Sequence, residues 1–361
     1  MNKPKVLLSM SGGIDSTVAA ILLLKQDYDV IGVTYRTWDS VSEGCFEREK
    51  GCCTVNAIME AKNMARTLGF PHYFLDLRQS FKDSVIRNFV DEYLAGRTPN
   101  PCVVCNAEIK WGEVLKMADE LNCNYIATGH YAQIEELNGN FYLKKGVDAE
   151  KDQTYFLWQL SQNVLKRTIF PLGKLTKPEV RQIAFDAGFE KLSKKTESQE
   201  ICFIPENDYR IFLEKEVENY GQIYTEGNFI DTNGNIIGKH KGYPAYTIGQ
   251  RKGLKTAFGK PMFVKEILPE SNEVVLADRE ALLSDFLYAR NCIFVDKKNL
   301  NTELEIEAKI RYRSPAVKAN LIFEANDRVK VNFKSPVWGI TKGQSVVFYK
   351  DDLILGGGII C

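Results

Sequence analysis

Residues 9–16, Ser-Met-Ser-Gly-Gly-Ile-Asp-Ser, combine residue types that bind phosphate. They follow the apolar run of residues 6–8 and precede an apolar segment, residues 17–25, that is long enough for a helix. Two glycines at a turn from strand to helix let the backbone approach an anion, and the free N–H groups at a helix start favour phosphate. The Walker A pattern requires a Lys-Ser/Thr pair after its last glycine, which this loop lacks. The loop therefore predicts a site that holds pyrophosphate as a leaving group, the alternative being an ordinary glycine turn with a Ser/Asp cap.

A second group of reactive residues is formed by three of the nine cysteines. Cys102 and Cys105 make a Cys-x-x-Cys pair beside a proline, and Cys202 lies far along the chain in a polar segment. Such a pair alone is compatible with a redox dithiol, half of a zinc site or partial ligation of an iron–sulfur cluster. No second Cys-x-x-Cys is present, so a structural zinc site is disfavoured.

The elements expected to position these residues alternate along the first half of the chain. Buried strands are predicted at residues 6–8, 30–35, 72–77 and 125–128, with helices at 17–25, 55–68, 81–94 and 108–121. The prolines of residues 96–106 are expected to exclude regular structure there. This alternation predicts a parallel sheet with ligands beyond the carboxyl ends of its strands. Four segments lie at such ends and are expected to form one pocket: residues 9–16, Tyr35, the Cys102 loop and residues 129–130.

The rest of the chain predicts two further domains. Asn138-Gly139 is expected to form a hairpin turn, residues 151–156 to begin a helix, and the capping box of residues 176–179 to begin another. Beyond about residue 207 helical periodicity fades, and the last eighty residues alternate repeatedly. The predicted fold class is α/β: a doubly wound parallel sheet in residues 1–206, a small mixed linker domain in 207–278, and an antiparallel β-barrel in 279–361.

Composition limits the classes of function. Apolar residues make up 44% of the chain and charged residues 26%, as in soluble globular proteins. Lys plus Arg and Asp plus Glu are both 47, so any contact with RNA must come from local patches. No apolar run reaches eighteen residues and no signal-peptide core follows the first methionine. We therefore expect a cytoplasmic protein without a membrane partner.

Two sets of motifs resemble known families. The loop of residues 9–16 resembles the signature of N-type ATP pyrophosphatases, which split ATP into AMP and pyrophosphate. Gly-Arg-Thr-Pro-Asn-Pro with a nearby Cys-Asn, Lys-Asp-Gln-Thr-Tyr-Phe and Ser-Gln-Glu-Ile-Cys-Phe resemble motifs of tRNA-specific 2-thiouridylases. The likeness extends to residues 249–254, 311–313 and 338–344, and so covers essentially the whole chain. It implies an adenine nucleotide α-hydrolase-like first domain, a barrel that contacts tRNA, and replacement of the 2-oxygen of the wobble uridine by sulfur.

The resemblance also implies a role for individual residues. ATP would be bound, with Mg²⁺, by Ser9, Met10, Ser11, Gly12, Gly13, Ile14, Asp15, Ser16, Tyr35 and Gly129. Cys105 would match the nucleophile, and Cys202 the cysteine that carries persulfide sulfur. Contacts with tRNA would come from Asn100, Pro101, Cys102, His130, Lys151, Asp152, Gln153, Arg311, Tyr312 and Gln344. Arg311 and Tyr312 are expected on a barrel strand, where they would contact phosphate and stack on a base.

One departure from the family pattern concerns Cys102, where many members have an acid/base Asp. A thiol cannot simply take that role. Cys102, Cys105 and Cys202 could instead hold three irons of a 4Fe–4S cluster, as the resemblance to a related branch implies, with a sulfide on the fourth iron. The cluster is preferred here, and a persulfide relay from Cys202 to Cys105 remains the alternative. Sulfur would come from a cysteine desulfurase, a sulfur-relay protein or sulfide.

The implied reaction has two steps. ATP would adenylate the 2-oxygen of uridine with release of pyrophosphate, and sulfur would then displace AMP from carbon 2. The base must leave its loop stack to react.

Two rival functions remain open: another ATP pyrophosphatase that amidates or ligates a small molecule, and a non-catalytic RNA-binding protein. The other cysteines (Cys45, Cys52, Cys53, Cys123, Cys292 and Cys361) are expected to be spectators.

Overall fold

The computed structural model describes residues 3–38, 55–194, 201–204, 208–254, 259–296, 303–324 and 328–361. Cys45, Cys52 and Cys53 lie outside these ranges, as do residues 195–200, which include the first three residues of the Ser-Gln-Glu-Ile-Cys-Phe segment. Two compact units are present. The first contains residues 1–85, 102–207 and 352–354, and the second contains residues 86–101, 208–351 and 355–361. The three-domain division of the sequence stays a prediction.

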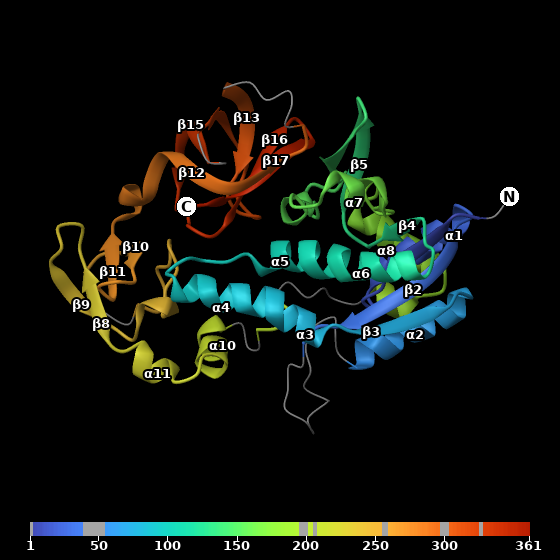
Figure 1. Cartoon of the computed structure of the whole chain (residues 1–361), viewed down its shortest axis with the longest axis horizontal. Coiled ribbons are helices and arrows are strands. Elements are labelled where there is room, and N and C mark those ends of the chain that lie inside the picture. The colour runs from blue at the N-terminus through green and yellow to red at the C-terminus, as the bar shows by residue number, and fades with distance from the viewer. Residues whose placement is uncertain are drawn as a thin grey trace. The chain divides into compact units, whose positions relative to one another are not determined.

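The first unit is built on a parallel five-stranded sheet of order β3-β2-β1-β4-β7 (Figure 1). Its strands are β1 (Lys5–Ser9), β2 (Asp29–Arg36), β3 (His72–Asp76), β4 (Tyr125–Ala127) and β7 (Thr168–Ile169). All the neighbours pair in parallel, which confirms the doubly wound fold. Because β1 has β2 on one side and β4 on the other, the chain changes direction across β1, and the carboxyl ends of β1 and β4 flank a topological switch point.

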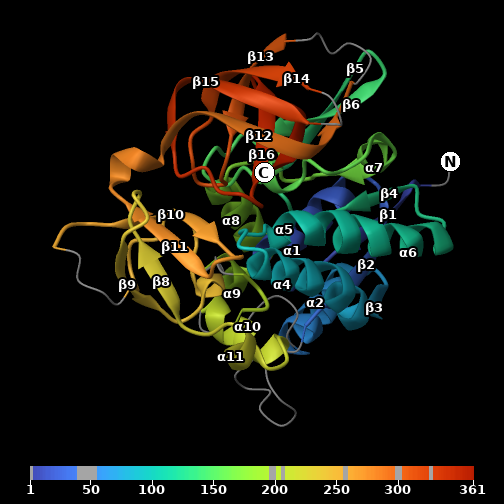
Figure 2. The ribbon, with the colours of Figure 1, turned by 60° about the vertical axis from the view of Figure 1, so that its left-hand side comes forward.

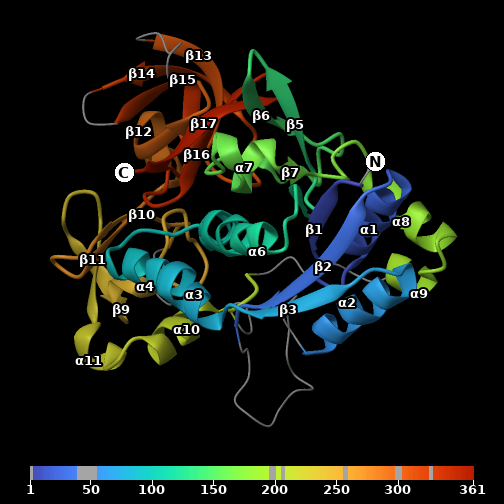
Figure 3. The same ribbon diagram turned by 45° about the vertical axis from the view of Figure 1, so that its right-hand side comes forward.

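Helices cover both faces of this sheet. Figure 3 shows α1 (Ile14–Lys25) and α8 (Lys177–Asp186) on one side of β1 and β2, with α6 (Val114–Glu120) on the other. The remaining helices of this unit are α2 (Val55–Leu68), α3 (Arg78–Phe81), the π-helix η3 (Cys105–Glu113), the 3₁₀ turn η4 (Thr154–Phe156), α7 (Gln162–Lys166) and α9 (Glu190–Ser193). The π-helix η2 (Lys82–Ile86) and α5 (Pro101–Val104) cross from one unit to the other.

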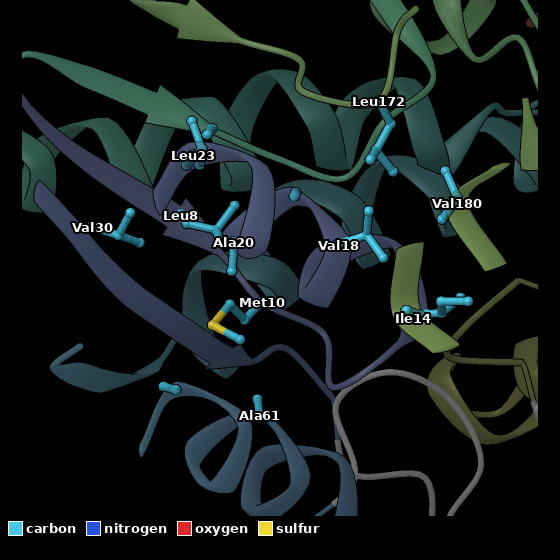
Figure 4. Packing of buried hydrophobic residues seen from close by; sticks show 14 of the residues in the cluster. Leu8, Met10, Ile14, Val18, Ala20, Leu23, Val30, Ala61, Leu172 and Val180 are labelled. Atoms are coloured by element: carbon cyan, nitrogen blue, oxygen red, sulfur yellow. The ribbon is translucent and has the colours of Figure 1, made fainter. Parts of the chain in front are cut away.

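A buried cluster fixes α1 relative to α8 (Figure 4). Val18 of α1 lies beside Leu172 and Val180, and all three side chains are inaccessible to solvent. α8 begins with the predicted capping box, in which Glu179 accepts a 2.7 Å hydrogen bond from the backbone N–H of Thr176. This packing brings the first turn of α8 toward the first turn of α1.

Three local predictions need correction. The prolines of residues 96–106 do not exclude a helix, because α5 begins at Pro101, where the missing N–H of proline costs nothing. The helix expected at residues 108–121 therefore starts earlier, as α5 and η3. The helix predicted from residue 151 is only the 3₁₀ turn η4. The hairpin at Asn138-Gly139 is confirmed: it joins β5 (Ala132–Leu137) to β6 (Asn140–Lys145).

The second unit contains a four-stranded sheet and a closed antiparallel barrel (Figure 2). The sheet has the order β10-β11-β8-β9, and the barrel runs β12-β15-β14-β13-β16-β17 and closes by pairing of β12 with β17. The strands of the four-stranded sheet are β8 (Gly227–Ile230), β9 (Ile236–His240), β10 (Phe263–Leu268) and β11 (Glu273–Ala277). Those of the barrel are β12 (Leu283–Phe294), β13 (Glu303–Lys309), β14 (Val317–Phe323), β15 (Val329–Trp338), β16 (Ser345–Lys350) and β17 (Leu353–Ile360). Its helical segments are α4 (Arg87–Leu94), α10 (Tyr209–Glu216), α11 (Tyr220–Ile223), η6 (Tyr243–Ala245) and η7 (Arg279–Leu282). The predicted linker domain and barrel are thus confirmed as architectures.

Arg311 and Tyr312 were expected on a barrel strand, and this is wrong. β13 ends at Lys309, and both residues lie in the turn that follows it. The backbone N–H of Ser314 donates to the carbonyl of Arg311, which closes the turn. No helix of the described ranges is long and apolar enough to cross a membrane.

Candidate functional site

The loop of residues 9–16 connects β1 to α1 at the switch point of the sheet. Its shape depends on Gly12, which has a φ of +71° and lies so close to α2 that a Cβ would come within 2.5 Å of the carbonyl oxygen of Ala57. Ser16 Oγ donates to the carbonyl of Gly13 at 3.1 Å and accepts from the backbone N–H of Ser11 at 3.3 Å. Ser9 is only 8% exposed, and its hydroxyl has no hydrogen-bond partner among the described residues. The loop is thus a preformed turn with an unsatisfied hydroxyl at its base, suited to a polar ligand.

A lysine reaches this loop from a distant part of the chain. Lys177 Nζ lies 2.7 Å and 3.0 Å from the two carboxylate oxygens of Asp15. Lys177 is only 6% exposed, and its amine also lies 5.6 Å from the centre of the Tyr131 ring. The Tyr131 hydroxyl donates to Asp15 at 2.9 Å. The loop's own sequence lacks the lysine of a Walker A motif. The buried amine of Lys177 nevertheless places a positive charge beside the loop.

The Lys-Asp-Gln-Thr-Tyr-Phe segment, residues 151–156, holds the backbone of Tyr131 in place. Gln153 accepts a 3.0 Å hydrogen bond from the backbone N–H of Tyr131, and its own N–H donates to the Tyr131 carbonyl. Asp152 is buried and accepts from the backbone N–H of Gly146 and from the hydroxyl of Thr154. Two side chains predicted to contact tRNA thus form hydrogen bonds within the protein, and Gln153 connects through Tyr131 to Asp15.

Two more of the predicted residues lie at the same edge. Gly129 follows β4, and its backbone lies against Asp15 and Ser16 at the start of α1, where a Cβ would come within 3.0 Å of Ser16 N. Tyr35 lies near the end of β2 and pairs with Leu75 of β3. Both observations agree with the expectation that the carboxyl ends of β1, β2 and β4 surround one site.

His130 follows Gly129 and is held by its neighbours. Its ring Nδ1 lies 2.8 Å from the hydroxyl of Thr128, and its ring lies 5.5 Å from that of Trp111. Burial, assisted by the charge of Lys110, holds the pKa of His130 well below its usual value. His130 is therefore neutral at pH 7, so it can offer hydrogen bonds but no charge to RNA.

Cys102 and Cys105 occupy the first turns of the continuous helix formed by α5 and η3. Cys102 reaches solvent, but the protein packed around it still raises the pKa of its thiol by desolvation, and the nearby Lys110 opposes that effect. Cys105 is half-buried and begins the π-helix that also carries Lys110. The thiol of Cys102 is therefore protonated at pH 7.

Cys202 is brought to the same side of the sheet by an aromatic anchor. Its neighbour Phe203 is 1% exposed, and its ring centre lies 5.6 Å from that of Phe81 and 6.4 Å from that of Trp38. Trp38 follows the carboxyl end of β2, and Phe81 ends α3, which follows the carboxyl end of β3. α3 also contacts η3, the helix that begins at Cys105. Cys202 itself is exposed beside this anchor.

The three cysteines do not form a metal site in this arrangement. Within the ranges that the structure describes, which include Cys102, Cys105 and Cys202, no three Cys, His, Asp or Glu side chains gather closely enough to hold a metal ion. The six described cysteines are all thiols. The 4Fe–4S cluster that was preferred from the sequence therefore stays a prediction, and the described positions of the three thiols give it no support.

The remaining tRNA candidates belong to the second unit. Arg311 Nη2 donates to the carbonyl of Gly339 at 2.5 Å and to the hydroxyl of Thr341 at 2.6 Å. Gln344 Nε2 donates to the carbonyls of Thr98 and Pro99 at 3.1 Å and 2.7 Å. Both side chains are thus engaged within the protein. Tyr312 has the amine of Lys309 at 5.5 Å from its ring centre, and Asn100 is half-buried beside the buried Pro101.

Sequence reasoning missed Lys177, Tyr131 and Lys110. A signal for Lys177 did exist, because a lysine at the first position of a helix opposes the helix dipole and calls for a nearby carboxylate. The partner, Asp15, is 162 residues away, so only the fold identifies it. Tyr131 and Lys110 are part of ordinary-looking apolar and helical stretches and carry no such signal.

Three family models match consecutive parts of the chain. Residues 4–206 match the model described as tRNA methyl transferase HUP domain. Residues 212–278 match the tRNA methyl transferase PRC-barrel domain, and residues 284–360 the aminomethyltransferase beta-barrel domain. Together these models span the two units.

Curated relatives match over nearly their entire lengths. A tRNA-specific 2-thiouridylase MnmA of Amoebophilus asiaticus is 48% identical over 361 residues, with 100% of this chain and 96% of the relative covered. The protein of the same name from Cytophaga hutchinsonii is 46% identical, with coverages of 99% and 97%. The tRNA-specific 2-thiouridylase MnmA 1 of Clostridium botulinum strain Loch Maree is 49% identical, with 99% of each chain covered.

Replacing Lys177 by methionine should leave the carboxylate of Asp15 without its cation. We expect the free energy of unfolding to fall by roughly 1–3 kcal/mol and the rate of ATP cleavage by about 100-fold, because a charged hydrogen-bond donor is lost from the phosphate loop. Urea unfolding and AMP formation measure the two effects. Lys174→Met is the matched control, since Lys174 is exposed, and it should change neither quantity. Equal activity of the Lys177 and Lys174 variants would contradict the role given to Lys177.

Replacing Gly12 by alanine should deform the phosphate loop. The new Cβ would meet the backbone of Ala57. The alanine would also have to adopt a left-handed backbone conformation, which costs about 1–3 kcal/mol. We expect weaker ATP binding in isothermal titration calorimetry and a lower unfolding midpoint. Gly221→Ala, where the added Cβ meets no atom within 4 Å, should behave like the unmodified protein.

Proposed function

The chain belongs to the family of tRNA-specific 2-thiouridylases, and we propose that it replaces the 2-oxygen of the wobble uridine of tRNA by sulfur, with cleavage of ATP to AMP and pyrophosphate. The observation that carries this proposal is the convergence of two kinds of chemistry on one edge of the sheet. The loop of residues 9–16, with Lys177, suits a phosphate ligand, and the anchor beside Cys202 lies at the ends of the neighbouring strands. A pyrophosphate-binding loop serves ATP cleavage, which fits the relatives' name better than the methyl transfer in the domain descriptions.

In the first step, the 2-oxygen of uridine attacks the α-phosphorus of ATP and pyrophosphate leaves. The backbone N–H groups at the start of α1 and the amine of Lys177 would stabilise the negative charge that grows on the leaving group. Lys177 is held by Asp15 in the structure, so its amine is already positioned at the loop. Asp15 is the carboxylate of this loop and would hold a magnesium ion that accompanies the nucleotide, which would neutralise phosphate charge. The activated uridine now carries AMP, a much better leaving group than the carbonyl oxygen.

In the second step, sulfur replaces AMP at carbon 2. A persulfide on Cys202 attacks carbon 2 through its terminal sulfur, and the bond from carbon 2 to the AMP oxygen breaks. The thiolate of Cys105 then attacks Sγ of Cys202, which releases 2-thiouridine and leaves a Cys105–Cys202 disulfide. A cellular thiol supplies the two electrons that reduce this disulfide. The exposure of Cys202 supports this role, because its persulfide must be loaded with sulfane sulfur from the persulfide of an external donor, such as a cysteine desulfurase or a sulfur-relay protein.

The persulfide relay is proposed in place of a 4Fe–4S mechanism because of the arrangement of the thiols. Cys202 and Cys105 come from segments that both pack on α3, whereas the three cysteines do not gather as cluster ligands in the described part of the chain. Lys110 lies on the same π-helix as Cys105, and its positive charge opposes the rise of the Cys102 pKa that desolvation causes.

Replacing Cys105 or Cys202 by serine should abolish 2-thiouridine formation, with a loss of at least about 1,000-fold, because serine neither carries a persulfide nor attacks a disulfide. The product is measured by mass spectrometry of nucleosides from tRNA incubated with the protein, ATP and a sulfur donor. Cys361→Ser is the matched control, since Cys361 is exposed at the chain terminus. Full activity of both Cys105→Ser and Cys202→Ser would contradict the proposal.

Iron content distinguishes the relay from the cluster. We expect protein purified without oxygen to form 2-thiouridine at the same rate before and after removal of iron by a chelator. Iron and acid-labile sulfide are measured in the same samples. Activity that is lost with the iron and restored with a rebuilt cluster would contradict the relay.

A further inference from the structure

The segment that leads to Asn100 is held at several points by other residues of the second unit, to which it belongs. Gly96 packs against the turn after β10, where its Cβ would come within 2.7 Å of Pro269. The hydroxyl of Tyr243 donates to the carbonyl of Leu94 at 2.5 Å. Arg97 donates to both carboxylate oxygens of Glu92, at 2.7 Å and 2.6 Å. Residues 94–97 are therefore fixed before the chain reaches Asn100.

The next two residues are held by the barrel. The backbone N–H of Thr98 donates to the carbonyl of Lys342 at 2.9 Å. Gln344 then donates through its one amide nitrogen to the carbonyls of both Thr98 and Pro99. Gly343 lies between these contacts with a φ of +90°, and a Cβ there would come within 2.8 Å of the Thr98 oxygen. The loop of residues 339–344, which joins β15 to β16 and is called the barrel loop below, thus packs closely against residues 98–99.

The barrel loop is itself rigidly placed. The backbone N–H of Gly343 donates to the carbonyl of Ile360, and the N–H of Ile360 donates to the carbonyl of Gln344. Arg311 holds the start of the loop through Gly339 and Thr341. The position of the Gln344 side chain therefore follows from the barrel and not from local chain flexibility.

We propose that Gln344 is a positioning residue that acts through the carbonyls of Thr98 and Pro99 to set the segment Asn100–Cys102 for the target base. Asn100 directly follows Pro99, and Cys102 lies two residues further in the first turn of α5. Since the amide nitrogen of Gln344 is used by these two carbonyls, we expect the loss of this donor to lower kcat more than the affinity for tRNA. This inference rests on the proposed function and extends it, because it makes the barrel a part of the base-binding apparatus.

The test compares Gln344→Met, which keeps the side-chain length but removes the donor, with the unmodified protein. We expect kcat for 2-thiouridine formation at saturating tRNA to fall about tenfold or more, while the Kd for tRNA changes less than twofold. Hydrogen exchange of the peptide that covers residues 94–102 should become faster. Gly343→Ala should give the same three results although it removes no polar side chain. Lys342→Met is the matched control, because its side chain is exposed and only its backbone contacts Thr98.

Two outcomes would overturn the inference. One is a Gln344→Met variant whose loss of activity is carried by a weaker Kd for tRNA with kcat retained. The other is unchanged exchange of residues 94–102 in that variant. The exchange measurement needs no catalysis, so it decides the role of Gln344 even if the unmodified protein forms no 2-thiouridine, which would instead refute the proposed function.

Discussion

The ion pair between Asp15 and Lys177 is the interaction on which the site depends. It joins the first turn of α1 to the first turn of α8, and Lys177 is almost fully buried. A buried amine is stable only if its charge is matched, so Lys177 and Asp15 must stay together until a ligand competes for one of them. A phosphate ligand is such a competitor. The fold therefore places Lys177 beside the phosphate loop, although the lysine is distant from the loop in sequence.

The second constraint is the position of the sulfur chemistry relative to that loop. Phe203 inserts between Trp38 and Phe81, which follow the carboxyl ends of β2 and β3. Because all the strands of the sheet are parallel, this is the same edge from which the phosphate loop leaves β1. An apolar contact thus fixes the position of the segment that carries Cys202, and the thiol itself stays exposed to solvent, as the proposed relay requires.

Several residues expected to touch tRNA are engaged inside the protein, and this gives them a connecting role. Gln153 supports Tyr131, which in turn holds Asp15, and Asp152 holds Gly146 and Thr154. Arg311 holds the loop from which Gln344 reaches Thr98 and Pro99. Contacts of this kind make the geometry of a site sensitive to the elements around it, because each buried donor must keep its acceptor.

The sequence by itself determined the parallel sheet, the barrel, the phosphate loop and the hairpin at Asn138-Gly139, because hydrophobic period and turn chemistry are local properties. It could not determine the helix start at Pro101, since proline both breaks helices and begins them. Nor could it assign Lys177 to Asp15, or place Phe203 beside Trp38 and Phe81. Those facts depend on which distant segments pack together, and only the tertiary structure decides that.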